Sequence, residues 1–279
     1  DLNPAEWQQF WVALGHEAVA MQQDGDRRLS LFYGIHGWNP GADYQRLLEL
    51  ARRHQIAGII FTSDPHHLVG TPLIQEPNIP RVAITAGTYA GVVSVETDST
   101  SLWGMLARLM RKCTRVGIVT TPSYPNAELR AFLTAQGFEV RPECIQAVRI
   151  EDAQWATNIA RMMMQAESRL RPEAVFITDD NLVPAATAGI AASGVAVPDE
   201  VEVVAHCNFP WPTPSAVPAR RIGYDTRRLL NACVDAIDAM RAGREVPSKI
   251  LIEARGEEES SGEAVEHEQM ELPARSSQV

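Results

Sequence analysis

Polar side chains that could bind a small ligand follow several short apolar runs of this chain. Such runs are typical of buried parallel strands, and clefts in open parallel sheets form outside the carboxyl ends of the strands. The polar residues at these positions are Asp64, Tyr124, Asp179, Asp180, His206 and Asn208. Together they offer donors and acceptors, and a ligand that leaves a buried partner unmet loses about 1–3 kcal/mol. The pattern predicts a binding site for a small polar molecule.

Some of these residues also have a purely structural explanation. Asp179 and Asp180 precede a helical pattern, where acidic residues cap the helix and interact favourably with its dipole. The sequence leaves capping and ligand contact equally open for this pair. His66 and His67 lie in a polar loop without a third ligand, so we expect solvated imidazoles and no metal site.

Motifs of the common catalytic sites are missing from the sequence. The chain contains no GxxxxGK[ST] or GxGxxG loop, no GxSxG elbow and no HExxH pair. Single serine, histidine and aspartate residues are frequent, but nothing in their spacing assembles them. We therefore expect a binding protein with no cofactor and no catalytic residues. An α/β hydrolase or isomerase with two lobes stays open as an alternative.

Short apolar runs alternate with helical patterns along the chain. The runs lie at residues 29–33, 58–62, 81–84, 92–95, 115–119, 138–140, 174–177, 201–205 and 249–253. The helical patterns lie at residues 4–21, 42–54, 101–112, 127–135, 153–167, 184–192 and 226–241. Strands that alternate with helices form βαβ units, whose parallel sheets carry helices on both faces. The sequence therefore predicts an α/β fold.

The charge of the chain argues against direct contact with nucleic acid. The 279 residues carry a formal net charge of −10, and an acidic surface repels phosphate backbones. The four cysteines form no CxxC pair, a pattern that suits reduced thiols in a cytoplasmic protein. No apolar stretch reaches the roughly eighteen residues that a transmembrane helix needs.

The last part of the chain differs in composition from the rest. From Gly256 onward the sequence reads GEEESSGEAVEHEQMELPARSSQV, which is acidic, rich in serine and poor in apolar residues. Such a segment cannot bury enough surface to offset its ordering entropy. We expect residues 256–279 to form a disordered acidic tail.

Six passages along the chain form an ordered set. They are RRHQIAGIIFTS at 52–63, NIPRVAI at 78–84, VSVETDSTSLWGMLARLM at 93–110, RVGIVTTPS at 115–123 with AELRAFLTAQGFEV at 127–140, PEAVFITDDNLVPAATAGIAASGVAVPDEVEVVAH at 172–206, and the segment at 220–256. In this order they resemble the effector-binding core of the lactose-repressor family of bacterial transcription regulators. The resemblance covers roughly residues 3–255, and its most specific piece is the run GVAVPDEVEVV.

The resemblance implies a fold of two similar α/β lobes, of the type I periplasmic-binding-protein-like kind. Three crossovers join the lobes, and the ligand lies in a cleft between them. It places the N-terminal lobe at residues 1–97 and 222–244, the C-terminal lobe at 98–221 and 247–255, and Tyr224 at a crossover. Family cores begin with a strand before a passage similar to LNPAEW at 2–7, so we expect that the first strand and the DNA-binding domain are absent from this chain.

Departures from the family pattern bear on the choice of ligand. Glu128 takes the position of an arginine that grips sugar hydroxyls in the family, and Asp179 takes that of an asparagine. Cys207 and Asn208 replace two aspartates. Replacing a donor arginine by an acceptor carboxylate reverses the polarity of the hydrogen bond. An amino sugar, a cationic metabolite and no ligand at all are therefore open alternatives to an ordinary sugar.

The function implied by the resemblance is that of a ligand-sensing and dimerisation core. We expect a cytoplasmic homodimer whose lobes close on a sugar-like effector and which contacts operator DNA through an upstream domain. The candidate ligand-binding residues are Asp64, Tyr124, Glu128, Asp179, Asp180, His206, Asn208 and Tyr224. A periplasmic solute-binding protein for a sugar or similar metabolite is the main alternative, because it shares the same fold.

Overall fold

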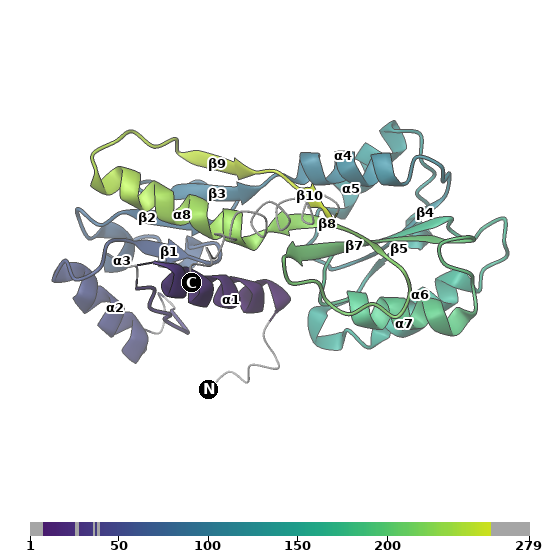
Figure 1. The fold of residues 1–279 in the computed structure, drawn as a ribbon, viewed down its shortest axis with the longest axis horizontal. Coiled ribbons are helices and arrows are strands. Elements are labelled where there is room, and N and C mark those ends of the chain that lie inside the picture. Colours follow the sequence, from purple (N-terminus) through teal and green to yellow (C-terminus); the bar gives the residue numbers. More distant parts are fainter. Residues whose placement is uncertain (1–7, 26–27, 36, 38–39, 258–279) are drawn as a thin grey trace, which may run out of the picture. The chain divides into compact units, whose positions relative to one another are not determined.

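The chain divides into two compact units, each with its own sheet and core. The computed structural model describes residues 8–25, 28–35, 37 and 40–257 (Figure 1). The first unit comprises Asp1–Asp98 and Tyr224–Glu253, and the second comprises Ser99–Gly223 and Ala254–Val279. The chain therefore passes between the units three times, near residues 98, 223 and 253.

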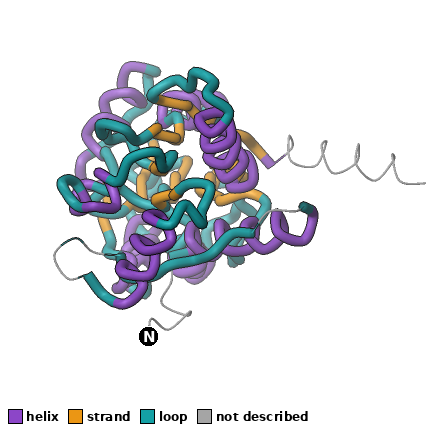
Figure 2. Tube along the Cα trace, turned by 90° about the vertical axis from the view of Figure 1, so that its left-hand side faces the viewer, coloured by secondary structure: helices purple, strands orange, loops and turns teal. Residues whose placement is uncertain are grey.

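The first unit is built on a four-stranded parallel sheet. Its strands, in the order β1-β2-β3-β9, are β1 (Ile59–Phe61), β2 (Arg81–Ile84), β3 (Val93–Thr97) and β9 (Lys249–Ile252). Its helices are α1 (Gln9–Asp24), α2 (Ala42–Arg52), α3 (Pro72–Gln75) and α8 (Thr226–Arg241), with a 3₁₀ turn at His66–Leu68. In Figure 2, which faces this unit, strands lie in the interior between helices.

Two apolar clusters cover the two faces of this sheet, as expected for parallel strands. On one face Val82 and Val95 pack with Leu229 of α8 and Leu14 of α1. On the other face Ala83 packs in a cluster with residues of α2 and α3. Alternate side chains of β2 thus enter opposite cores, which explains why this strand reads as a continuous apolar run.

The second unit is built on a six-stranded sheet in the order β10-β8-β7-β6-β4-β5. Its strands are β4 (Val116–Thr120), β5 (Ile145–Ala147), β6 (Ala174–Ile177), β7 (Glu202–Phe209), β8 (Arg220–Asp225) and β10 (Arg255–Gly256). Its helices are α4 (Ser99–Leu109), α5 (Asn126–Ala135), α6 (Trp155–Met164) and α7 (Val183–Ser193), with 3₁₀ turns at Pro142–Cys144 and Ile150–Asp152. The neighbours β5, β4, β6 and β7 run parallel, and β10 pairs antiparallel with β8. The predicted α/β fold is confirmed.

Helices α6 and α7 pack closely against each other. The Thr157 hydroxyl of α6 donates to the Ala185 carbonyl of α7 at 2.9 Å. A Cβ added to Gly189 of α7 would lie 2.1 Å from the Thr157 carbonyl oxygen, so only glycine allows this approach. The composition of α7, rich in alanine and glycine, therefore sets the helix spacing.

The strand predicted at residues 29–33 is not formed. This segment pairs with no strand, and β1 is an edge strand of its sheet. Leu29 packs against the cluster around α8, while Phe32 packs against the cluster around α2. The segment is only partly buried, however, since Leu31 and Tyr33 are 52% and 47% exposed. Apolar residues alone therefore do not make a strand, because a strand also requires backbone pairing with a neighbour.

The strand predicted at residues 138–140 is also wrong. Only an isolated bridge between Arg115 and Glu139 forms there, whereas β4 takes β5 as its neighbour with Ile118 opposite Ile145. The prediction missed β5, β8 and β10, which are short or carry charged residues.

The assignment of residues 247–253 to the C-terminal lobe needs correction. Strand β9 pairs with β3 of the first unit, with Val95 opposite Ile250, so this segment belongs to the first unit. Residues 254–256 do lie in the second unit. The predicted disorder of the tail beyond residue 257 and the passage at 2–7 lie outside the described residues.

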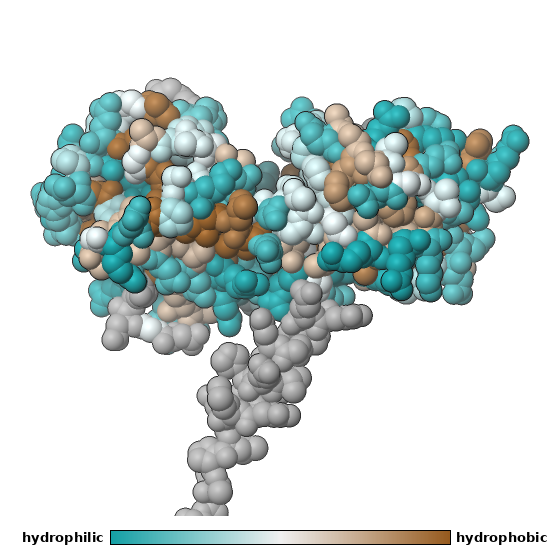
Figure 3. Space-filling model, turned by 90° about the horizontal axis from the view of Figure 1, so that it is seen from above, coloured by the Kyte–Doolittle hydropathy of each residue, from teal (hydrophilic) through white to brown (hydrophobic). Residues whose placement is uncertain are grey.

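The surface of the described residues is mostly hydrophilic, with apolar side chains showing on the first unit (Figure 3). No helix of the described part of the chain has the length and apolar character needed to cross a bilayer.

Candidate functional site

The carboxyl ends of β4, β6 and β7 lie side by side in the second unit. Val119, Ile177 and Ala205 are aligned across the three strands. The residues that follow them are therefore neighbours, which brings Thr178 next to Thr120 and to His206. This alignment places the polar residues predicted after separate apolar runs along one edge of a sheet.

A chain of buried hydroxyl groups fixes this edge. The Thr178 hydroxyl donates to the Thr120 hydroxyl at 2.9 Å, and the Thr120 hydroxyl donates to the Asn126 Oδ1 at 2.8 Å. The Asn126 amide then donates to the Thr121 carbonyl at 3.1 Å. Because Asn126 is the first residue of α5, the chain of bonds anchors that helix to the sheet.

Asp180 and Asn208 form a buried pair on neighbouring segments. The Asn208 Nδ2 donates to the Asp180 Oδ2 at 2.6 Å, and the two residues are 2% and 3% exposed. Burial raises the pKa of the Asp180 carboxyl, while the His206 imidazole and the hydrogen bond from Asn208 oppose the rise. Of the residues predicted for the site, Asp180 and Asn208 share a hydrogen bond, and His206 acts on Asp180 through its charge.

Asp179 closes a turn in front of α7. Its Oδ1 accepts hydrogen bonds from the Asn181 backbone at 2.9 Å and from the Asn181 amide at 2.8 Å. The helix starts later, at Val183, and its N-cap residue Leu182 makes no side-chain cap. Asp179 is therefore a turn residue rather than the cap of α7, and its half-buried carboxylate keeps a second oxygen for other donors.

Tyr124 is held by an aromatic neighbour. The Trp103 indole Nε1 of α4 donates to the Tyr124 hydroxyl at 3.0 Å. Burial raises the pKa of Tyr124 to about 12, so the phenol stays protonated and can donate. Glu128 lies exposed in the first turn of α5, and no described residue forms an ion pair or hydrogen bond with its side chain.

Asp64 follows β1 in the first unit, and its carboxylate is hydrogen-bonded mainly to nearby residues of the same unit. Its carboxylate accepts hydrogen bonds from the Thr85 hydroxyl at 2.6 Å, from the His66 backbone at 2.9 Å and from the Tyr89 hydroxyl. Burial would raise the pKa of Asp64, but these hydrogen bonds outweigh it and lower the pKa to about 2. Most acceptor positions of this carboxylate are thus occupied by the loop at residues 85–89 together with His66.

Tyr224 is buried near the end of β8, where the chain enters the first unit. The next residue, Asp225, caps α8 by accepting from the Arg228 backbone at 3.0 Å. His66 and His67 belong to no group of three potential metal ligands within the described part of the chain. The His66 ring instead lies 3.1 Å from Asp64.

Sequence reasoning missed four residues that shape the edge of the second sheet: Thr120, Thr178, Asn126 and Trp103. A signal existed for the two threonines, because each is the first polar residue after an apolar run. Asn126 and Trp103 carried no such signal, since their roles depend on helices that dock from elsewhere in the chain.

Comparison with known proteins agrees with this architecture. The family described as periplasmic binding protein-like domain matches residues 108–256. No curated protein matches the sequence. The chain is similar in structure to a LacI family transcriptional regulator from Lactobacillus casei with bound glucose, at 16% identity and a TM-score of 0.64, over 90% of this chain and 94% of that one.

Two further solved structures are similar to this chain. One is a regulatory protein of the LacI family from Chloroflexus aggregans, with 18% identity, a TM-score of 0.65 and 89% of each chain covered. The other is a putative ribose operon repressor from Burkholderia thailandensis, with 18% identity, a TM-score of 0.64 and coverage of 88% of this chain and 93% of that one. At these identities the likeness concerns the fold.

The family match covers more than half of the 279 residues and spans the whole polar edge of the second unit, from β4 to β10. The type of fold that the sequence resemblance implied is confirmed. The chain belongs to the family of periplasmic binding protein-like domains.

Proposed function

We propose that this chain is the ligand-sensing core of a transcription regulator of the lactose-repressor type, and not an enzyme. Its ligand is a small polar, sugar-like metabolite. The similar solved structures are regulators, one of them with bound glucose, which favours this function over that of a periplasmic solute-binding protein.

The observation that carries the proposal is the buried polar edge of the second unit. Burying a carboxylate is costly, yet Asp180 is 2% exposed and is held by Asn208 alongside a further chain of buried hydroxyl groups. Fold stability gains little from such an arrangement. A preorganised set of donors and acceptors does favour the binding of a polar ligand, because the ordering cost is met before the ligand arrives.

In this proposal Asp180, His206 and Asn208 form the fixed floor of the site. Glu128 can turn toward a ligand, while Asp179 offers its second carboxylate oxygen and Tyr124 its hydroxyl. Asp64 and Tyr224 lie in the first unit, where Asp64 holds the loop at residues 85–89. The net acceptor character of Asp179 and Glu128 favours ligands that donate, such as hydroxyl or ammonium groups.

The ligand acts by binding one conformational state of the protein better than another. We propose a cytoplasmic homodimer, because regulators of this type read two half-sites with a two-fold assembly. The net charge of −10 disfavours DNA binding by these residues themselves, so operator contact falls to another segment. Light scattering on the purified chain tests the dimer.

A thermal-shift screen against sugars, amino sugars, polyols and nucleosides tests the proposed function. A ligand at a hundred times its dissociation constant stabilises the native state by about 2.7 kcal/mol, which gives a clear rise in melting temperature. We expect a hit whose shift is lost in Asp179→Ala and Glu128→Ala. Asp199→Ala is the matched control, because Asp199 is exposed and precedes β7 at the opposite end of the strand.

A well-folded chain with no hit in the screen would contradict a metabolite sensor of these classes. A hit that survives in both site variants, or that is lost equally in Asp199→Ala, would contradict the placement of the site.

A further inference from the structure

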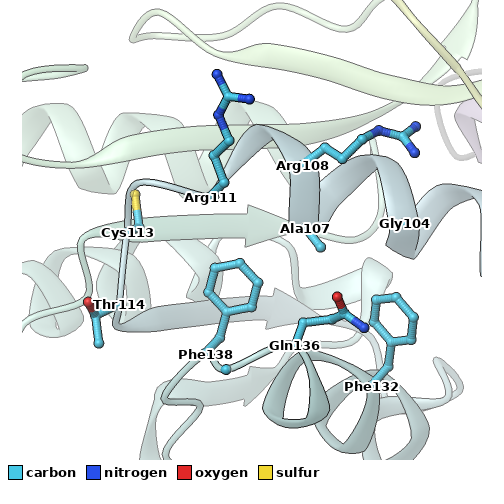
Figure 4. A pocket seen from close by; sticks show the side chains of 10 residues that line it. Gly104, Ala107, Arg108, Arg111, Cys113, Thr114, Phe132, Gln136 and Phe138 are labelled. Carbon is cyan, nitrogen blue, oxygen red and sulfur yellow. The ribbon is translucent and has the colours of Figure 1, made fainter.

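A groove between α4 and α5 lies apart from the polar edge of the second unit. Its volume is about 590 Å³. Its lining includes Ala107, Arg108, Arg111, Phe132, Gln136 and Phe138. Figure 4 shows the two phenyl rings and the Gln136 amide on the α5 side, and the guanidinium groups of Arg108 and Arg111 extending from α4 away from these rings. The groove thus has an apolar floor and a cationic flank.

The cations of this flank have no partner within the described part of the chain. No described acceptor forms a hydrogen bond or ion pair with the side chains of Arg108, Arg111 or Lys112, all of which are exposed. Basic residues suit the carboxyl end of a helix because they complement its dipole. Three cations within five residues, without a described partner, also attract a complementary anionic segment.

The chain itself delivers such a segment beside α4. The Ala254 backbone donates to the Ser101 hydroxyl of α4 at 2.8 Å. Two residues on, Gly256 of β10 lies against α4, since a Cβ added there would be 3.7 Å from the Met105 sulfur. Met105 and Arg108 are three residues apart on a helix, so they share one face and are separated by about 4.5 Å along the axis. Arg108 is therefore within reach of the residues that directly follow Gly256.

The composition of the segment after Gly256 complements the groove. Residues 257–279 contain seven glutamates and one arginine, and three glutamates come first, at 257, 258 and 259. Further along, Val265, Met270 and Leu272 supply apolar side chains. Glu258 and Glu259 precede these apolar residues, which alternate with the remaining glutamates, so the segment can meet the cationic flank of α4 before its apolar side chains reach the groove.

We infer that the acidic C-terminal segment of this chain docks onto α4 and fills the groove between α4 and α5. Glu258 and Glu259 pair with the cationic flank, and the apolar residues that follow contact Phe132 and Phe138. Attachment at Gly256 raises the effective concentration of the segment to the order of millimolar, so weak contacts suffice. This inference is independent of the proposed function.

Proteolysis of the full chain with a glutamate-specific protease tests the docking. Cleavage after the glutamates of residues 258–271 is followed by intact mass, in the wild type and in the double variant Arg108→Gln/Arg111→Gln. Neither substitution adds a cleavage site. Because proteolysis follows the undocked fraction of a segment, we expect cleavage to be about fivefold faster in the double variant. The same acceleration is expected for the wild type in 0.5 M salt, which screens exposed charges.

Arg161→Gln is the matched control, because Arg161 is an exposed arginine on α6 without a described side-chain partner. The protease should cleave this control variant at the wild-type rate. Melting temperatures equal to that of the wild type should show that all variants fold. Equal cleavage rates in the wild type and the double variant would overturn the inference. Protection that rises with protein concentration would also overturn it, because the segment would then dock onto another copy.

Discussion

Replacing Gly189 by alanine should destabilise the second unit, although the same change usually stabilises a helix. Alanine is favoured over glycine inside helices by about 1 kcal/mol. At Gly189, however, the new Cβ would lie 2.1 Å from the Thr157 carbonyl oxygen and 2.9 Å from its carbon. Both are backbone atoms of α6, so no side-chain rotation relieves the contact.

The expected magnitude follows from this geometry. Relief requires α6 and α7 to separate by about 1 Å, and overpacking of this kind costs about 1–3 kcal/mol. The separation also weakens the hydrogen bond from the Thr157 hydroxyl to the Ala185 carbonyl, worth about 1 kcal/mol. After the gain in helix propensity, the net loss of unfolding free energy is about 1–3 kcal/mol.

Hydrogen exchange at the amides of residues 155–193 measures this loss, because it reports on the second unit alone. Gly104→Ala in α4 of the same unit is the control: an added Cβ there meets nothing within 4 Å, so we expect a gain of up to about 1 kcal/mol. If Gly189→Ala proves as protected as the wild type, the reasoning from the helix contact is refuted.

Two further predictions concern buried titratable groups. In the native state the pKa of Asp180 lies above its ordinary value of 3.8. As the pH rises through this elevated pKa, the buried carboxyl ionises and the free energy of unfolding falls. Asp180→Asn removes that loss, and its melting temperature relative to wild type should increase from pH 4 to pH 7; a constant difference would contradict the raised pKa. Burial raises the pKa of Cys207 and of Cys233 to about 12, and that of the less buried Cys113 to about 11. Iodoacetamide at pH 8, followed by peptide mass, should therefore label Cys113 before Cys207 and Cys233, and the reverse order would show that the native packing around these thiols is different.

The sequence was sufficient for the elements that its periodicity marks strongly. Helix α8 was predicted with its observed bounds, and α2, α4, α5 and α7 to within a few residues at each end. The strands β2 and β6 were predicted from apolar runs buried on both faces. Local pattern is enough in these cases, because a buried parallel strand or an amphipathic helix needs its own apolar residues wherever it lies.

The candidate site was predicted in part. The position of a polar residue after an apolar run identified Asp180, His206 and Asn208, since parallel strands end at the same edge of a sheet. Its arrangement depended on register, which aligns Ile177 with Ala205 and so brings Asp180 to Asn208. Register is a relation between distant segments, and no single stretch of sequence encodes it.

The sequence by itself determined the α/β class, the order of most elements and the residue types available for binding. The tertiary structure alone decided which segments became strands and which side chains remained available. Residues 29–33 are as apolar as other strands yet form none, and Leu31 and Tyr33 of this segment stay exposed. Residues 249–252 form β9 in the first unit because β3 offers an edge there. Asp64, similar to Asp180 in sequence context, is occupied by Thr85 and Tyr89, because hydrogen bonds between distant residues arise only when the fold brings them together.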